Sequence, residues 1–163
     1  MHTTCTCGQY LTNVSCPNDI VLWAYPDSQW KEIQAIGKID PVMLPNATFE
    51  IWRCTKCKRL AIFRYPVYRG SEYVIADGAV LQRKVDPTYE LWHVFTDVEW
   101  DEIIFPREID ASKIPDSSIK IEINEDYTRL FLHDSNEGKV LEYQFVPYTD
   151  EPTPRILTPV DDR

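Results

Sequence analysis

The chain has 163 residues, of which 44% are hydrophobic and 26% are charged. This length and composition predict one globular domain, or one domain with a small metal-bound lobe. No apolar run is long enough to cross a bilayer, and the first residues lack the basic and apolar stretches of a signal peptide. We therefore expect a cytoplasmic protein that does not enter a membrane.

The formal net charge of −9 is concentrated in the second half of the chain. Residues 1–82 carry a balance of +1, whereas residues 83–163 carry −10. An acidic field repels nucleic-acid phosphates and attracts basic protein surfaces. The charge distribution therefore favours a basic protein partner.

The first part of the chain predicts strands around one short helix. The apolar residues 20–25 are a strand candidate. Residues 27–36 predict a helix, because apolar residues recur every three positions between a capping residue, Asp27 or Ser28, and Gly37. Two more strands are predicted on either side of the second cysteine pair, at residues 49–53 and 60–65.

The second part of the chain predicts mainly strands. Residues 72–76 and 79–85 are strand candidates joined by a hairpin turn at Asp77-Gly78. A further strand and a three-stranded meander are predicted at residues 89–95, 119–123, 129–133 and 139–146. The proline-rich residues 149–163 are expected to be disordered, and no internal repeat is evident.

One further segment has two interpretations. Thr96-Asp-Val-Glu99 matches a capping box and predicts a helix over residues 97–105. The alternation of Val98 and Trp100 also fits a strand.

Two close cysteine pairs predict a metal site. Cys5 and Cys7 lie at the N-terminus, and Cys54 and Cys57 follow a strand candidate. In a reducing compartment such pairs favour a tetrahedral metal over disulfides, so we expect all four to bind a structural Zn²⁺. The fifth cysteine, Cys16, has no partner at this spacing and is expected to be a small buried residue.

The segment Trp52-Arg-Cys54-Thr-Lys-Cys57-Lys-Arg59, taken with Cys5-Thr-Cys7-Gly8, resembles the paired knuckles of zinc-ribbon proteins over roughly the first 65 residues. It departs from the usual ribbon in three ways: the first pair encloses one residue, Lys58 stands where glycine is usual, and the pairs are far apart in sequence.

The resemblance, together with the predicted elements, implies a β-rich α+β fold. A zinc-ribbon-like lobe with an inserted strand and helix is expected over residues 1–70. An antiparallel β-rich part with one or two short helices is expected over residues 71–148, either packed on the lobe or continuous with it. The remaining residues, 149–163, form the tail.

Catalytic motifs are absent from the sequence. There is no glycine-rich phosphate loop and no nucleophile motif, and a four-cysteine zinc site has no open position for a substrate. We therefore predict a protein that is not an enzyme.

A protein-binding module is the favoured function. Acidic and aromatic residues mix over residues 97–110, as they do in protein interfaces. The predicted partner-binding residues are Asp97, Glu99, Trp100, Asp101, Glu102, Phe105, Glu108 and Asp110. In size, charge and lack of catalytic motifs the chain is similar to bacterial immunity proteins, which suggests an inhibitor that masks a basic partner.

A nucleic-acid-binding zinc ribbon is the alternative function. Basic and aromatic residues are interleaved over residues 52–69, as they are in single-strand binders. The basic residues are Arg53, Lys56, Lys58, Arg59, Arg64 and Arg69, and the aromatic residues are Trp52, Phe63, Tyr65 and Tyr68.

Overall fold

The computed structural model describes residues 2–5, 7–64, 71–81 and 85–146, and their main element is a closed antiparallel barrel. Around the barrel the strands follow the order β10-β11-β12-β7-β6-β5-β3-β8. The strands from the first part of the chain are β3 (Val21–Pro26), β5 (Phe49–Arg53), β6 (Leu60–Arg64) and β7 (Ser71–Leu81). Those from the second part are β8 (Glu90–Thr96), β10 (Ile119–Ile123), β11 (Arg129–Asp134) and β12 (Lys139–Val146).

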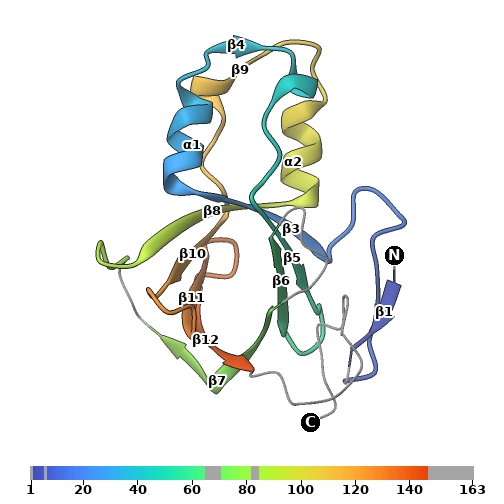
Figure 1. Cartoon of the computed structure of the whole chain (residues 1–163). Helices are drawn as coiled ribbons and strands as arrows, with labels where there is room; N and C mark the ends of the chain where they lie inside the picture. Colours follow the sequence, from blue (N-terminus) through green and yellow to red (C-terminus); the bar gives the residue numbers. More distant parts are fainter. Residues whose placement is uncertain (1, 6, 65–70, 82–84, 147–163) are drawn as a thin grey trace.

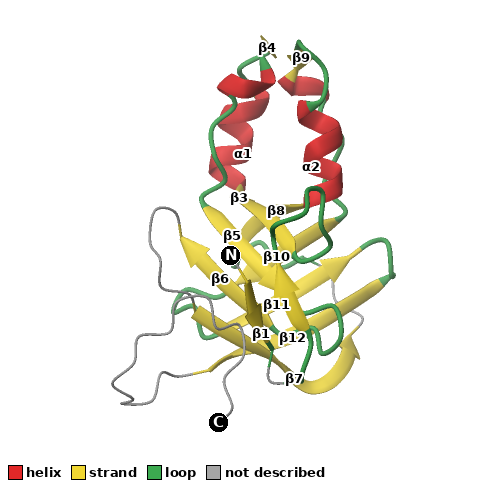
Figure 2. Ribbon diagram, turned by 90° about the vertical axis from the view of Figure 1, so that its right-hand side faces the viewer, coloured by secondary structure: helices red, strands yellow, loops and turns green. Residues whose placement is uncertain are grey.

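Two short helices form a layer at one end of the barrel, as Figure 1 and Figure 2 show. Helix α1 directly follows β3, and helix α2 directly follows β8. Two short strands pair with each other beyond the helices, and two 3₁₀ helices lie on the way back to the barrel. These elements are α1 (Asp27–Gln34), α2 (Asp97–Ile104), β4 (Lys38–Ile39), β9 (Ile109–Asp110), η1 (Pro41–Met43) and η2 (Ala111–Lys113).

The two helices begin in different ways. The predicted capping box of α2 is confirmed: Glu99 N donates to the Thr96 hydroxyl at 3.1 Å, and Thr96 N donates to the Glu99 carboxylate at 2.8 Å. The predicted capping of α1 by Asp27 or Ser28 is wrong, because Pro26 occupies the N-cap position and no side chain caps this helix. The Asp27 carboxylate is held by other partners.

Alternating apolar residues of the strands fill the barrel. The buried interior residues are Leu22, Ala24, Phe49, Ile51, Leu60, Ile62, Trp92, Val94, Ile119, Ile121, Ile123, Leu130, Leu132 and Tyr143. A second core joins the barrel to the helices. There Trp30 of α1 and Trp100 of α2 contact Tyr25 and Phe95, with ring centroids 4.9–5.6 Å apart. Burial of these large rings fixes the helices on the barrel end.

The barrel and its helical layer consist of two similar halves, which we call repeat one (residues 20–81) and repeat two (residues 90–146). Repeat one runs β3-α1-β4-η1-β5-β6-β7, and repeat two runs β8-α2-β9-η2-β10-β11-β12. Strand register repeats as well. Val21 lies opposite Trp52 in the β3–β5 pair, and Leu91 lies opposite Glu122, each 70 residues later, in the β8–β10 pair.

The two repeats meet about an approximate twofold axis. Three strand pairs join the repeats, and in each pair two residues that are 70 positions apart lie opposite each other. These facing residues are Ala24 and Val94, Ile39 and Ile109, and Val74 and Gln144. This is the geometry of an isologous contact, in which equivalent residues meet on the axis.

The expected absence of an internal repeat is therefore wrong. Between residues 20–64 and 90–134 the sequence aligns without gaps, but few positions are identical. The identical pairs are Asp27/Asp97, Trp30/Trp100, Glu32/Glu102, Ile33/Ile103, Ile39/Ile109, Asp40/Asp110, Pro45/Pro115, Ile51/Ile121, Arg59/Arg129 and Leu60/Leu130.

The N-terminal segment, residues 2–19, lies on the outside of repeat one. Strands β1 (His2–Thr4) and β2 (Tyr10–Thr12) pair with each other, and Figure 1 shows β1 outside the barrel. Beneath this segment an apolar cluster covers the outer face of β5 and β6. Its buried members are Cys5, Leu11, Ile20, Val21, Trp52, Cys54, Ala61 and Phe63.

Most predicted strands are confirmed, but the hairpin at Asp77-Gly78 is wrong. Residues 71–81 form the single strand β7, and its pairing with β12 shifts register between Leu141 and Tyr143. The turn-forming residues therefore lie at an irregularity within a long strand. The predicted meander is confirmed as β10, β11 and β12.

The fold is β-rich with two helices, as predicted. A separate zinc-ribbon lobe is not confirmed, because β5 and β6, which flank the second cysteine pair, belong to the barrel. The predicted tail, residues 149–163, lies outside the described residues. None of the helices in the described ranges has the length and apolarity needed to cross a membrane.

Candidate metal centre

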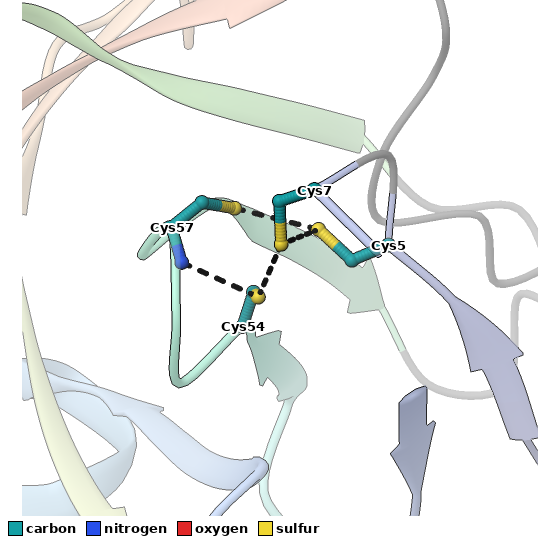
Figure 3. Close-up of side chains that lie close together, drawn as sticks. All are labelled: Cys5, Cys7, Cys54 and Cys57. Carbon is teal, nitrogen blue, oxygen red and sulfur yellow. Dashed lines mark hydrogen bonds between the residues drawn. The ribbon is translucent and has the colours of Figure 1, made fainter. Parts of the chain in front are cut away.

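Four cysteine sulfurs meet where the N-terminal segment reaches the β5–β6 turn. Figure 3 shows the four side chains pointing toward one another. The Sγ–Sγ distances are 3.3 Å for Cys5–Cys7, 3.4 Å for Cys5–Cys57 and 3.5 Å for Cys7–Cys54. All four sulfurs lie within 4.8 Å of one another. The predicted cluster is therefore confirmed as a group at metal-binding distance.

Each cysteine pair is shaped by a tight turn with one residue in the left-handed backbone region. Gly8 has φ +93°, and its N–H donates to the Cys5 carbonyl at 2.8 Å. Lys58 has φ +65°, and its N–H donates to the Cys54 carbonyl at 3.0 Å. Glycine adopts this region without cost, whereas a lysine is strained there. The departure from the ribbon pattern at Lys58 thus changes the residue but keeps the turn.

The environment acts differently on the four thiols. Burial raises the pKa of Cys5 and of Cys57. The backbone N–H of Gln9 lowers the pKa of Cys7 to about 7. A divalent cation among four sulfurs favours their deprotonated forms, because thiolates are the metal-binding species.

The size of the cluster fits a metal ion. Zn–S bonds of about 2.3 Å in a tetrahedron put sulfurs about 3.8 Å apart, close to the separations in this cluster. A disulfide needs sulfurs about 2.05 Å apart, and all five cysteines are free. The cluster can therefore bind a metal ion, and its four sulfur donors suit zinc. Four protein ligands leave no open position, which is the pattern of a structural site.

The second cysteine turn is fastened to the barrel. The Tyr143 hydroxyl donates to the Lys58 carbonyl at 2.6 Å, and Tyr143 itself is fully buried in the barrel interior. On the other side, Arg53 N donates to the Ile20 carbonyl at 2.9 Å. A metal held by both pairs would therefore tie the N-terminal segment to a fixed point on repeat one.

Residues 1–77 match the model of a family described as a domain of unknown function (DUF8617). The matched part contains all four clustered cysteines and ends within β7, so it covers the N-terminal segment and most of repeat one. No curated protein and no solved structure matches the chain.

Two residues near the cluster in sequence lie outside it. The prediction that Cys16 is buried is wrong: it is exposed, and its thiol lies 3.7 Å from the Asp97 carboxylate. Sequence gave no sign of this contact, because the two residues are 81 positions apart. His2 is exposed, and its ring lies 5.7 Å from that of Tyr10.

The predicted partner-binding residues divide into two groups. The carboxylates of Asp97, Glu99 and Asp110 accept hydrogen bonds within the domain, and Trp100 packs in the core between the helices. Asp101 is half-buried, whereas the exposed members are Glu102, Phe105 and Glu108. Some acidic residues of this segment thus form hydrogen bonds within the domain, whereas others are exposed to solvent.

Several residues of the segment 52–69, the candidate nucleic-acid-binding segment, make contacts within the domain instead. Trp52 and Phe63 are buried under the N-terminal segment and cannot stack on bases. Arg53 lies 3.5 Å from the Asp134 carboxylate. Tyr65, Tyr68 and Arg69 lie outside the described residues.

Sequence reasoning missed the polar contacts at the start of each helix. Asp27 binds His93 Nε2 at 2.8 Å and Lys31 Nζ at 2.8 Å, whereas the matching Asp97 accepts from Trp23 Nε1 at 3.0 Å. The available signal was the pattern Asp-x-x-Trp-x-Glu-Ile, which occurs in both helices, 70 residues apart.

Proposed function

We propose that this chain is a non-enzymatic, zinc-stapled acidic module that binds a protein with a basic surface and masks it, as an inhibitor or immunity-type protein does. The metal is proposed to be Zn²⁺, with Cys5, Cys7, Cys54 and Cys57 as structural ligands in a ribbon-like pair of knuckles. The module is proposed to work in the cytoplasm, where a reducing environment keeps the thiols available.

The supporting observation is a difference between two surfaces that share one fold. Where α2 meets η1, Val42, Ile104 and Phe105 are exposed, with 87% of the Val42 and Phe105 surfaces accessible. We call these three residues the α2/η1 face. The matching residues in the other repeat are Ser112, Gln34 and Ala35. Because both sets occupy the same positions, the fold itself does not require the apolar residues.

The two helices also differ in charge, and α2 is the more acidic one. The α2 sequence contains four acidic residues and no basic one, whereas α1 contains Lys31 beside two acidic residues. At the Lys31 position α2 has Asp101, and Glu102 is exposed next to it. An apolar centre with an acidic rim suits a partner with a basic surface.

The partner is first identified by capture on the immobilised chain and then tested as a purified protein by calorimetry. The proposal predicts a basic partner whose affinity falls by about tenfold or more between low and high salt. Phe105→Ser should weaken binding by about tenfold, as loss of an interface anchor does, and Glu102→Lys should weaken it further at low salt.

Ala35→Ser is the matched control, because Ala35 occupies the Phe105 position in repeat one and is also exposed. Its affinity should equal that of the unmodified chain. A partner without a basic surface, or equal affinities for Phe105→Ser and Ala35→Ser, would contradict the proposed face.

A further inference from the structure

A cavity of about 530 Å³ opens beside the α2/η1 face, with Val42 and Ile104 among its lining residues. Its other walls combine aromatic and acidic residues with small, apolar and amide side chains of the segment from Pro41 to Ala47 and with Cys16. The aromatic residues are Trp23, Tyr25 and Trp100, and the acidic residues are Glu50, Asp97 and Asp101. Among the described residues that line it there is no lysine, arginine or histidine. The cavity is thus a negatively charged, aromatic-walled site in the size range of ligand pockets.

Comparison with repeat one shows which charge is missing from this cavity. In α1 the Asp27 carboxylate has two cationic or proton-donating partners, Lys31 at 2.8 Å and His93 at 2.8 Å. In repeat two Asp97 takes the place of Asp27. The Lys31 position holds Asp101, and the His93 position holds Trp23. A carboxylate that is paired with an ammonium group in one repeat therefore has a second carboxylate beside it in the other.

Within the described part of the chain, every donor to the Asp97 carboxylate is uncharged. It is 7% exposed, and it accepts hydrogen bonds from Trp23 Nε1 and from Asn18 N, both at 3.0 Å. Among the described residues no basic side chain forms an ion pair with Asp97 or Asp101. Like charges at i and i+4 of a helix destabilise it. Their combined field also raises the pKa of Cys16, which lies at the same cavity.

We infer that this cavity binds the guanidinium group of an arginine side chain presented by the protein partner. This inference rests on the proposed function and names the central contact of the α2/η1 face. The guanidinium supplies the positive charge that Lys31 supplies in repeat one. It is planar and weakly hydrated, so it can stack on the Trp100 or Trp23 ring while it pairs with Asp101.

The aromatic walls distinguish an arginine from a metal cation. A hard cation such as Mg²⁺ or Ca²⁺ needs several oxygen ligands, but the oxygens of Asp97 already accept hydrogen bonds from Trp23 and Asn18. A guanidinium group needs one further carboxylate and an aromatic face, and Asp101 with the two indoles offers both.

The test uses two small probes and the full chain. N-acetyl-arginine amide carries the cation, and N-acetyl-citrulline amide is its neutral isostere. We expect the arginine probe to shift the Trp23 and Trp100 indole N–H signals in NMR spectra, with saturation in the millimolar range. The citrulline probe should bind at least about fivefold more weakly, which corresponds to the loss of one screened ion pair. Equal responses to both probes, or no saturable shift, would overturn the inference.

Two substitutions of Asp101 locate the site. Asp101→Asn should weaken arginine binding by about fivefold, and Asp101→Lys should abolish it, because the new ammonium group pairs with Asp97 as Lys31 pairs with Asp27. Asp101→Lys should also raise the thermal midpoint. Glu102→Gln removes the same charge from a residue that does not line the cavity, so binding should stay unchanged. If Asp101→Asn and Glu102→Gln behave alike, the cavity is not the site.

The outcome for the cavity can be separated from that for the proposed function. If the arginine probe does not bind but Phe105→Ser still weakens binding of the whole partner, the cavity inference fails and the protein-binding function stands. If the probe binds at the cavity but the partner has no basic surface, the proposed function fails and the cation site stands.

Discussion

Repeat one and repeat two share strand order, register and helix placement, but they differ on their outer faces. In repeat one Trp52 and Phe63 point outward and are buried under the N-terminal segment. At the same positions repeat two has Glu122 and His133, which lie 3.4 Å from each other. The common fold therefore does not need a metal. The four-cysteine cluster belongs to the outer face of repeat one, which is apolar and is covered by the N-terminal segment.

The cover of each face matches its chemistry. Repeat one needs an apolar lid, and the four-cysteine cluster holds that lid against the β5–β6 turn. In repeat two Glu122 is fully buried, and its carboxylate accepts a hydrogen bond from Asp86 N at 2.7 Å. A backbone donor from the chain just before β8 therefore binds the buried carboxylate of this face. The difference between the repeats predicts that metal loss acts on one half of the barrel first.

The largest expected effect comes from removing a metal ligand. Purified protein should hold close to one equivalent of metal, and Cys57→Ser or a strong chelator should remove it. Because Trp52 and Phe63 then lose their cover, the free energy of unfolding should fall by about 3 kcal/mol or more. Metal content by mass spectrometry and urea unfolding measure both quantities.

Loss of the metal should first loosen the structure only near the cysteine cluster. Hydrogen exchange should rise in β1, β2 and the β5–β6 turn, while β10 and β11 keep their protection. Cys16→Ser is the control, since Cys16 is exposed and lies outside the cluster, and it should leave both metal content and stability nearly unchanged. Less than half an equivalent of metal, or uniform loss of protection in both repeats, would contradict the proposed role of the cluster.

Local patterns in the sequence predicted most of the elements and the four-cysteine cluster. The cysteine spacing identified all four sulfurs, and the capping box of Thr96 and Glu99 indicated a helix at α2, although the alternation of Val98 and Trp100 also fitted a strand. Both signals depend on neighbouring residues. Asp77-Gly78 misled for the same reason: its turn preference is local, whereas pairing of β7 with β12 is decided by distant residues.

The repeat was harder to recognise. Its identical residues mark positions where the fold needs one side chain, such as Asp40 and Asp110, whose carboxylates each accept a backbone N–H of the following 3₁₀ helix. At most other positions the fold tolerates side chains of different volume or polarity. The two repeats therefore keep the same strand register although few of their residues are identical. The cavity beside α2 was beyond prediction, because its residues come from β3, β5, η1 and α2, which meet only in the folded chain.

The next largest effect should separate the two helix-start aspartates. Asp97→Ala leaves the Trp23 indole N–H and Asn18 N without their acceptor in a buried site, and it should cost about 2–4 kcal/mol of unfolding free energy. Asp27→Ala should cost only about 1 kcal/mol, because a third of the Asp27 side chain is exposed and solvent screens its ion pair. Chemical denaturation of both variants measures the two losses of unfolding free energy. A larger loss for Asp27→Ala than for Asp97→Ala would contradict the assignment of Asp97 as the more buried and more important acceptor.

The Asp27 carboxylate of repeat one should make part of the stability depend on pH. The hydrogen bond from His93, followed by that from Lys31, lowers the pKa of Asp27 below its usual value. A carboxyl group with a lowered folded-state pKa stabilises the fold above its unfolded-state pKa of about 3.9, and this contribution is lost as pH falls through the folded value. The stability difference between the unmodified chain and Asp27→Asn should therefore be constant from pH 6 to about 5 and shrink below about pH 4 in urea unfolding. A difference that grows on acidification would contradict the assigned partners.

The smallest expected effect concerns backbone strain at the second cysteine turn. Lys58 has φ +65°, so Lys58→Gly relieves a steric cost of about 1–2 kcal/mol but adds freedom to the unfolded chain. The net result should be an unfolding free energy that is higher by up to about 1 kcal/mol, with unchanged metal content.

Tyr127→Gly is the matched control in the turn between β10 and β11. Tyr127 has φ +59°, but its hydroxyl also donates to Glu90 at 3.1 Å, so relief of strain is offset by a lost hydrogen bond. Urea unfolding should therefore rank Lys58→Gly above Tyr127→Gly. The opposite ranking would mean that the Lys58 side chain, and not only its backbone, supports the cysteine turn.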